Sequence, residues 1–224
     1  MKTWNKCAKL MLIVVACLLV ASPALMAAPK GGLTVKATGT VPLPPVGGQY
    51  ISPADIHAWL ASGVELTAEL KARHGLFRNI KTAPGGKLGG EVENFDSDLT
   101  FEITGTGKLE GWSHTVTIPT SVETHTGARK EGDKVQSFET SMERIEGSAS
   151  DDVFESIEVV AGGANGFDSP GKTTLTDLGD GTWLVESSFD IKYSLKFKGA
   201  KGGPLEGVEG VTGGVIEMVA VPAD

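Results

Sequence analysis

The stretch Thr182–Lys198, TWLVESSFDIKYSLKFK, indicates the fold class most clearly. Apolar and polar residues alternate along it, a period of two that places successive side chains on opposite faces of a β-strand. Ser187 is the polar member of an inward-facing set whose apolar members are Trp183, Val185, Phe189, Ile191, Tyr193, Leu195 and Phe197. We expect a bend or bulge near Ser187-Ser188, because the stretch is long for one straight strand.

Similar alternation recurs along most of the chain. It predicts strands at Leu33–Val41, Val64–Arg73, Leu76–Ile80, Leu99–Ile103, Trp112–Ile118, Val122–Thr126, Val135–Ile145, Val153–Val160 and Val215–Val221. Glycine-rich segments between them predict loops at 83–90, 162–172 and 199–214, and Gly179-Asp180-Gly181 is typical of a hairpin turn.

One segment predicts a helix. Ser52 is a good N-cap, Pro53 suits the first helical position and Gly63 is a stop signal. We therefore predict an all-β domain, a two-sheet β-sandwich with one short N-terminal helix at about residues 53–62.

The first 27 residues have the anatomy of a secretory signal peptide. A basic start precedes the apolar run Leu10–Ala21, and small residues at 22–28 suit cleavage. The apolar run is too short to span a bilayer comfortably. We predict a signal peptide at 1–27, a Gly/Pro-rich segment at 28–48 and a single domain at 49–224, in a bacterial protein that is periplasmic or secreted.

A lipoprotein is the alternative for the leader, because residues 14–17 loosely resemble a lipobox that ends at Cys17. The apolar run continues past that point, which favours ordinary cleavage. Both cysteines, Cys7 and Cys17, lie in the leader, so the remaining chain has no disulfide and no cysteine zinc site.

Charge excludes some partners. The leader holds three of the 20 basic residues and none of the 28 acidic ones, so the net charge of −8 becomes −11 without it. Such a chain attracts neither nucleic acid nor an anionic membrane surface.

Residues Gly166–Thr173 match the phosphate-binding pattern G-x-x-x-x-G-K-T. That pattern needs a helix after the loop, and the β-branched residues that follow predict a strand instead. We therefore predict no nucleotide partner. If the alternative held, Lys172→Ala would remove ATP affinity.

No catalytic or cofactor residue is predicted. The sequence contains no G-x-S-x-G, and Glu186 and Asp190 would lie about 13 Å apart on one strand, too far for a glycosidase pair. Acidic groups at Asp96–Asp98, at Asp151-Asp152 and at Asp177 with Asp180 are typical of solvated turns. Calcium at one of these turns is the alternative, and the metal ligands stay unassigned.

The histidines and tryptophans favour packing roles. None of His57, His74, His114 and His125 has metal-ligand spacing. We expect His114 to be half-buried and hydrogen-bonded, and His125 to point to solvent beside Glu123. The residues Trp59, Trp112 and Trp183 lie on apolar faces, so core packing accounts for them.

Four blocks together resemble an uncharacterised family of exported bacterial β-rich proteins: Tyr50–His57, Gly132–Thr140, Ser169–Thr176 and Gly199–Gly207. The resemblance implies export and a β-rich fold and carries no information on mechanism. Because the sequence has no catalytic constellation and packing accounts for its tryptophans, we expect an exported, non-catalytic protein of surface, matrix or periplasmic interactions, with another protein or a glycan as its partner. The alternative is a glycan-binding module or weak secreted hydrolase that uses the three glycine-rich loops.

Overall fold

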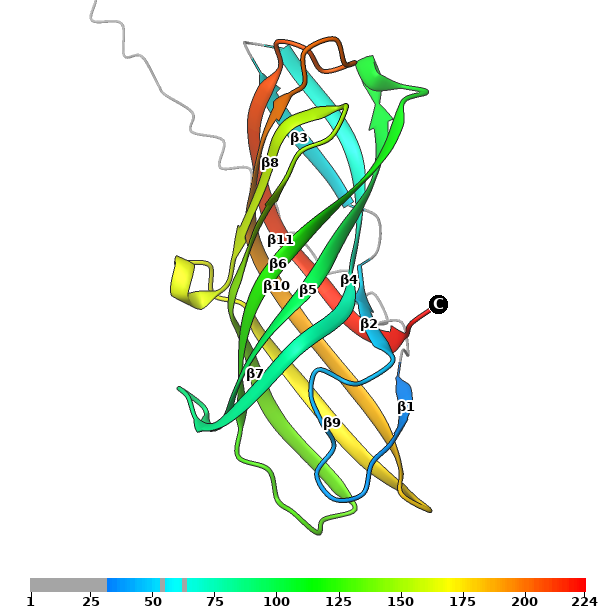
Figure 1. Ribbon diagram of the computed structural model, residues 1–224, viewed down its shortest axis with the longest axis vertical. Coiled ribbons are helices and arrows are strands. Elements are labelled where there is room, and N and C mark those ends of the chain that lie inside the picture. The colour runs from blue at the N-terminus through cyan, green and yellow to red at the C-terminus, as the bar shows by residue number, and fades with distance from the viewer. Residues whose placement is uncertain (1–31, 53–54, 62–63) are drawn as a thin grey trace, which may run out of the picture.

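The computed structural model describes residues 32–52, 55–61 and 64–224 (Figure 1). Apart from two short 3₁₀ segments, the regular structure of these residues is β-sheet. The strands are β1 Leu33–Lys36, β2 Gly48–Ile51, β3 Asp55–Ala61, β4 Val64–Gly85, β5 Gly89–Thr106, β6 Ser113–Gly127, β7 Val135–Ala149, β8 Phe154–Ala161, β9 Pro170–Gly179, β10 Thr182–Gly199 and β11 Glu209–Pro222. The 3₁₀ segments are η1 Gly107–Leu109 and η2 Gly163–Asn165.

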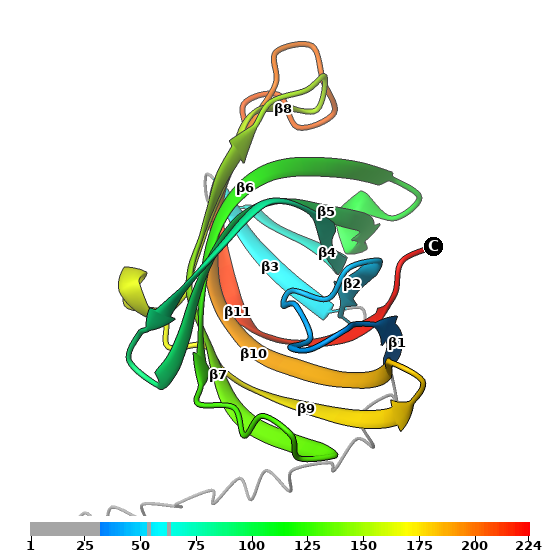
Figure 2. The ribbon, with the colours of Figure 1, turned by 60° about the horizontal axis from the view of Figure 1, so that its bottom comes forward.

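All described strands belong to one antiparallel sheet that closes on itself. Neighbours run from β10 through β11, β2, β4, β5, β6 and β7, and both β8 and β9 link β7 back to β10. Figure 2 shows the resulting ring of strands. The all-β prediction is confirmed, but the described residues form one sheet where we expected a two-sheet sandwich. The long strands exchange partners along their length, so no break divides them into two layers.

The strand β10 has the alternation that its sequence predicts. Its inward side chains from Val185 to Phe197 are buried, and most of the side chains between them are exposed to solvent. No register shift falls at Ser187-Ser188, where we expected a bend or bulge. Near this point β10 instead changes partners, from β1 to β11 on one edge and from β9 to β8 on the other.

The helix predicted at 53–62 is wrong for the residues that the structure describes. Asp55–Ala61 form β3, which pairs with the first half of β4, and positions 53–54 and 62–63 lie outside the described residues. This half of β4 has β5 on its other edge, so a helix would leave one row of its backbone groups unpaired. The hydroxyl of Ser52, expected to cap a helix, accepts a hydrogen bond from the Ala72 N–H at 2.9 Å.

Other segments also extend further as strands than predicted. The strand β4 continues through Leu76 and Asn79, with positive φ angles of 52° and 54°, so residues 76–80 do not turn back as a separate strand. The predicted loop at 83–90 is the tight β4–β5 turn, and the predicted loop at 199–214 gives way to β11 at Glu209. The segment after the P-loop-like match is a strand, β9, as predicted.

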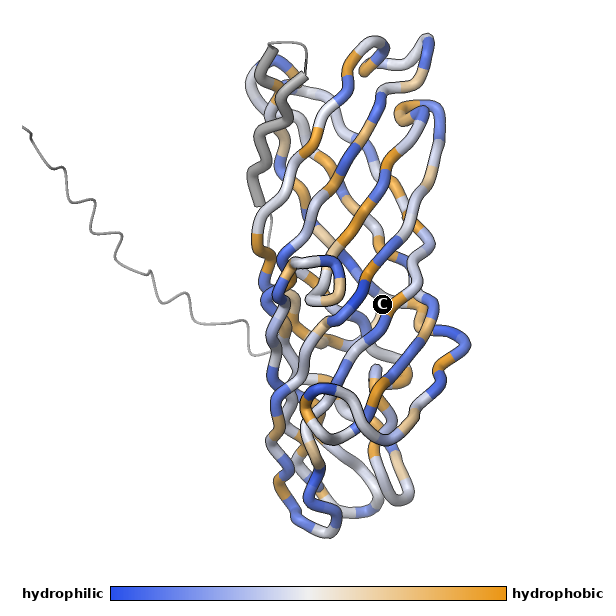
Figure 3. The backbone as a smooth tube through the Cα atoms, turned by 90° about the vertical axis from the view of Figure 1, so that its left-hand side faces the viewer, coloured by the Kyte–Doolittle hydropathy of each residue, from blue (hydrophilic) through white to orange (hydrophobic). Residues whose placement is uncertain are grey.

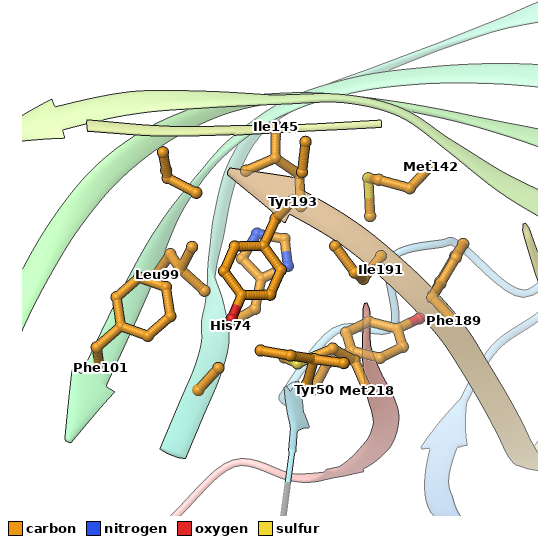
Figure 4. Close-up of a pocket in the computed structure, with 14 residues that line it drawn as sticks. Tyr50, His74, Leu99, Phe101, Met142, Ile145, Phe189, Ile191, Tyr193 and Met218 are labelled. Atoms are coloured by element: carbon orange, nitrogen blue, oxygen red, sulfur yellow. The ribbon is translucent and has the colours of Figure 1, made fainter. Parts of the chain in front are cut away.

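The sheet encloses a packed core. Apolar side chains alternate with polar ones along the strands (Figure 3), and the inward ones form a continuous buried cluster. A cavity of about 30 Å3 remains inside it, lined mainly by apolar side chains such as Leu99, Phe101 and Ile145 (Figure 4). In the described part of the chain, no helix has the length and apolar character needed to cross a membrane.

Truncating Phe197 tests this packing. Phe197 is 2% exposed and its ring lies edge-on to that of Phe154 at 5.9 Å. We expect Phe197→Ala to lower the free energy of unfolding by about 3–5 kcal/mol, because the cavity left behind cannot be refilled. Urea denaturation measures this value. The matched control is the outward neighbour Lys196→Ala, expected to change it by less than about 0.5 kcal/mol. Equal losses of unfolding free energy in the two variants would contradict the placement of Phe197 on the inward face.

Candidate functional site

Three loops meet at the end of the sheet where β10 begins. They are residues 37–40 after β1, residues 131–136 around the start of β7, and the β9–β10 turn at 179–181. The Ala37 N–H donates to the Gly181 carbonyl at 2.9 Å, and the Asp177 N–H donates to the Lys134 carbonyl at 2.7 Å. The hydrogen bonds between these segments hold the loops in one arrangement before any ligand arrives.

These loops surround a cleft of about 510 Å3. Its polar side chains supply acceptors and donors without a lysine or arginine among them: Thr38, Thr40, Glu131, Asp133, Gln136, Asp177 and Asp180. The four carboxylates of this set form no ion pair with any residue that the structure describes. The cleft is therefore acidic, concave and preformed.

Trp183 forms the apolar wall of the cleft. It is the first inward-facing residue of β10, and its half-buried side chain packs against the core while also lining the cleft. Packing against the core is confirmed for Trp112 and Trp183, whereas the side chain of Trp59 lies outside what the structure describes. The place of Trp183 in the cleft was not predicted, because alternation shows which side a residue faces but not that residues 37–40 and 131–136 lie beside it.

The segment between β1 and β2 crosses the same mouth of the sheet (Figure 2). Its side chains Val41, Leu43 and Pro44 are buried, so residues 41–45 form a plug over the interior. Arg129 fastens the plug: its guanidinium donates to the Val41 carbonyl at 2.6 Å and pairs with Glu91 at 2.7 Å.

Glu93 lies beneath the plug and is 3% exposed. Thr124 donates a hydrogen bond to one carboxylate oxygen at 2.8 Å, and Arg129 Nη2 lies 3.6 Å from the other, Oε1. Oε1 and the Thr140 hydroxyl have no hydrogen-bond partner among the described residues, and both residues line a void of about 20 Å3. Burial raises the pKa of Glu93 to about 7.

A second group of polar side chains lies inside the core, where its members hydrogen-bond to one another. Tyr50 donates to Ser187 at 3.1 Å, and Ser187 shares a hydrogen bond with Thr173 at 2.8 Å, which explains a serine on the buried face of β10. His74 hydrogen-bonds Ser97 at 2.6 Å, and burial lowers its pKa to about 4. Figure 4 shows His74 and Tyr50 among the residues around the internal cavity. His74 is therefore neutral near pH 7.

Most of the other candidate residues lie apart from this cleft. His114 is half-buried and hydrogen-bonded as predicted, to Asp151 at 2.8 Å. Together with Asp152 they place three potential metal-ligand atoms within 4.8 Å of one another. Asp151 already accepts hydrogen bonds from the Val153 and Phe154 N–H groups, so within the described protein its oxygens are engaged.

His125 differs from its expected place. It does lie beside Glu123, at 3.0 Å, but its side chain is only 13% exposed because the Gly86 turn covers it. Among the acidic groups, Asp96 accepts a hydrogen bond from Asn79 and Asp98 accepts one from Arg78, both between β4 and β5. Only Asp177 and Asp180 line the cleft, which lies away from the three glycine-rich loops that the sequence analysis favoured.

Comparisons with known proteins give no matching family model, no matching curated protein and no matching solved structure. The geometry and chemistry of the cleft are therefore the features that bear on function.

Replacing Glu93 tests its burial. The folded pKa of about 7 lies above the unfolded value of 4.5, so the contribution of Glu93 to stability is complete below pH 4.5 and is lost as pH rises through 7. We expect Glu93→Gln to remove about 3 kcal/mol of this pH dependence, as measured by urea denaturation between pH 4 and pH 8. The exposed Glu186→Gln serves as control and should keep the wild-type slope. An unchanged slope in Glu93→Gln would contradict the raised pKa.

Proposed function

We propose that this chain is an exported, non-catalytic binding protein that holds a glycan in the cleft at the mouth of its closed sheet. The observation that carries the proposal is a preformed cleft with Trp183 on one wall and hydrogen-bonding side chains on the others. Export rests on the predicted signal peptide at 1–27, which lies outside the described residues.

The chemistry of the cleft suits a saccharide. A sugar ring has an apolar face of C–H groups that packs on an indole, and hydroxyls around its rim that need acceptors. Carboxylates beside Trp183, the Gln136 amide and the threonine hydroxyls supply such partners within one concavity. The loops are already tied together, so little conformational entropy is lost on binding.

A weak hydrolase is the second candidate, because the cleft brings several carboxylates together. A glycosidase needs one pair about 5–10 Å apart on either side of the scissile bond. Binding without release of reducing ends supports the non-catalytic proposal, and turnover that is lost in Asp177→Asn supports the hydrolase.

Removing the indole tests the binding proposal. Residues 28–224 are titrated by calorimetry with soluble oligomers of glucose, xylose, N-acetylglucosamine and glucosamine. For any oligomer that binds, we expect Trp183→Ala to weaken the affinity at least tenfold, because the apolar wall of the cleft is lost.

Two controls separate this effect from misfolding. Trp112 is also half-buried against the core but does not line the cleft, so Trp112→Ala should keep the affinity. Trp183→Phe keeps an aromatic wall and should retain most of it. Absence of binding by every oligomer, or equal losses in both alanine variants, would refute the proposal.

A further inference from the structure

The charges that line the cleft favour a positively charged ligand over a neutral or an anionic one. Glu131, Asp133, Asp177 and Asp180 face one concavity, and no described cation pairs with them. Elsewhere on the surface several acids do have such partners, for example Glu102 with Arg73 and Glu155 with Lys198. A neutral ligand would leave this repulsion uncompensated, and an anionic one would add to it.

One carboxylate has a defined place beside the aromatic wall. Asp177 of β9 lies directly opposite Trp183 of β10 in the pairing register. Directly opposed residues of antiparallel strands share a face of the sheet, with Cβ atoms about 5 Å apart. One oxygen, Oδ1 of Asp177, accepts the Gly179 N–H at 2.8 Å, which orients the carboxylate and leaves the other oxygen for a ligand.

A carboxylate next to an indole is a site for an ammonium group. The carboxylate supplies a charge-assisted hydrogen bond, and the face of the indole attracts a cation through its quadrupole. An ammonium carried on a sugar ring would use both groups while its C–H face packs on Trp183. Such a ligand also offsets the repulsion among the remaining carboxylates.

We propose that the ligand of the cleft is an amino-sugar glycan with free ammonium groups, held by Asp177 against Trp183. This inference rests on the proposed function, since it names the chemical class of glycan that the same cleft binds.

The test compares two oligomers with one backbone. A β-1,4-linked glucosamine pentamer and its fully N-acetylated form are titrated into residues 28–224 by calorimetry, at 50 and 500 mM NaCl and pH 6. We expect the free-amine oligomer to bind at least tenfold more tightly at low salt, and to lose most of that advantage at high salt. The N-acetylated oligomer should show little dependence on salt.

Two variants test whether Asp177 is the carboxylate that binds the ammonium group. Asp177→Asn keeps the oxygen that accepts the Gly179 N–H and should weaken binding of the free-amine oligomer about tenfold, a clearly larger factor than it weakens binding of the N-acetylated oligomer. Asp190→Asn removes an equal charge from the exposed face of β10, outside the cleft, and should change neither. Thermal melting checks that both variants fold.

The outcomes separate the two proposals. Equal, salt-independent binding of both oligomers would overturn the amino-sugar inference and leave glycan binding intact. Equal losses in Asp177→Asn and Asp190→Asn would assign the preference to the net charge of the chain and also overturn it. Failure of every oligomer to bind would refute the proposed function itself.

Discussion

The pairing of both edges of β10 is the constraint on which the rest of the molecule depends. One edge bonds to β1 and β11 and the other to β9 and β8, so this strand joins the first and last parts of the chain into one ring. Closure pairs the backbone groups that an open sheet would expose at its edges. It also gives the sheet an inside, so that the inward side chains of β10 from Val185 to Phe197, apart from Ser187, contribute to a single apolar core.

Closure creates a second requirement, which is that the mouth of the ring must be covered. The chain meets it with the segment between β1 and β2, whose apolar residues plug the interior while residues 37–40, with the hydroxyls of Thr38 and Thr40, form a wall of the cleft. Arg129 links the plug to β5 through its contacts with the Val41 carbonyl and with Glu91, and the buried Glu93 lies beneath the plug. The packing of the interior and the shape of the outer cleft therefore depend on one short segment.

Local patterns predicted much of this structure. The inward set of β10, the hairpin turn at Gly179–Gly181 and the strand after the P-loop-like match follow from alternation and turn chemistry, which act between near neighbours. The prediction of a helix at 53–62 failed because β4 offers this segment a row of backbone partners, and that information lies outside the segment. Closure into one sheet was missed for the same reason, since partner exchange along β10 involves strands distant in sequence.

The candidate site was predicted only in part. Asp177, Asp180 and Trp183 were recognised as an acidic turn and an apolar position, but residues 37–40 and 131–136 reach them through hydrogen bonds between loops that no local pattern reveals. Glu93 shares the inward face of β5 with Phe95 and Leu99, but the strand predicted there began only at Leu99, so the burial of Glu93 was missed.

The pairing of β2 with β11 has a consequence for how the molecule folds. Ile51 lies opposite Val219, about 170 residues away along the chain, so the ring cannot close until nearly all of the polypeptide is available. Contacts between such distant segments form slowly, because the entropy of a long loop must be lost before they stabilise anything. The enclosed core is therefore complete only once the last strand, β11, has paired with β2.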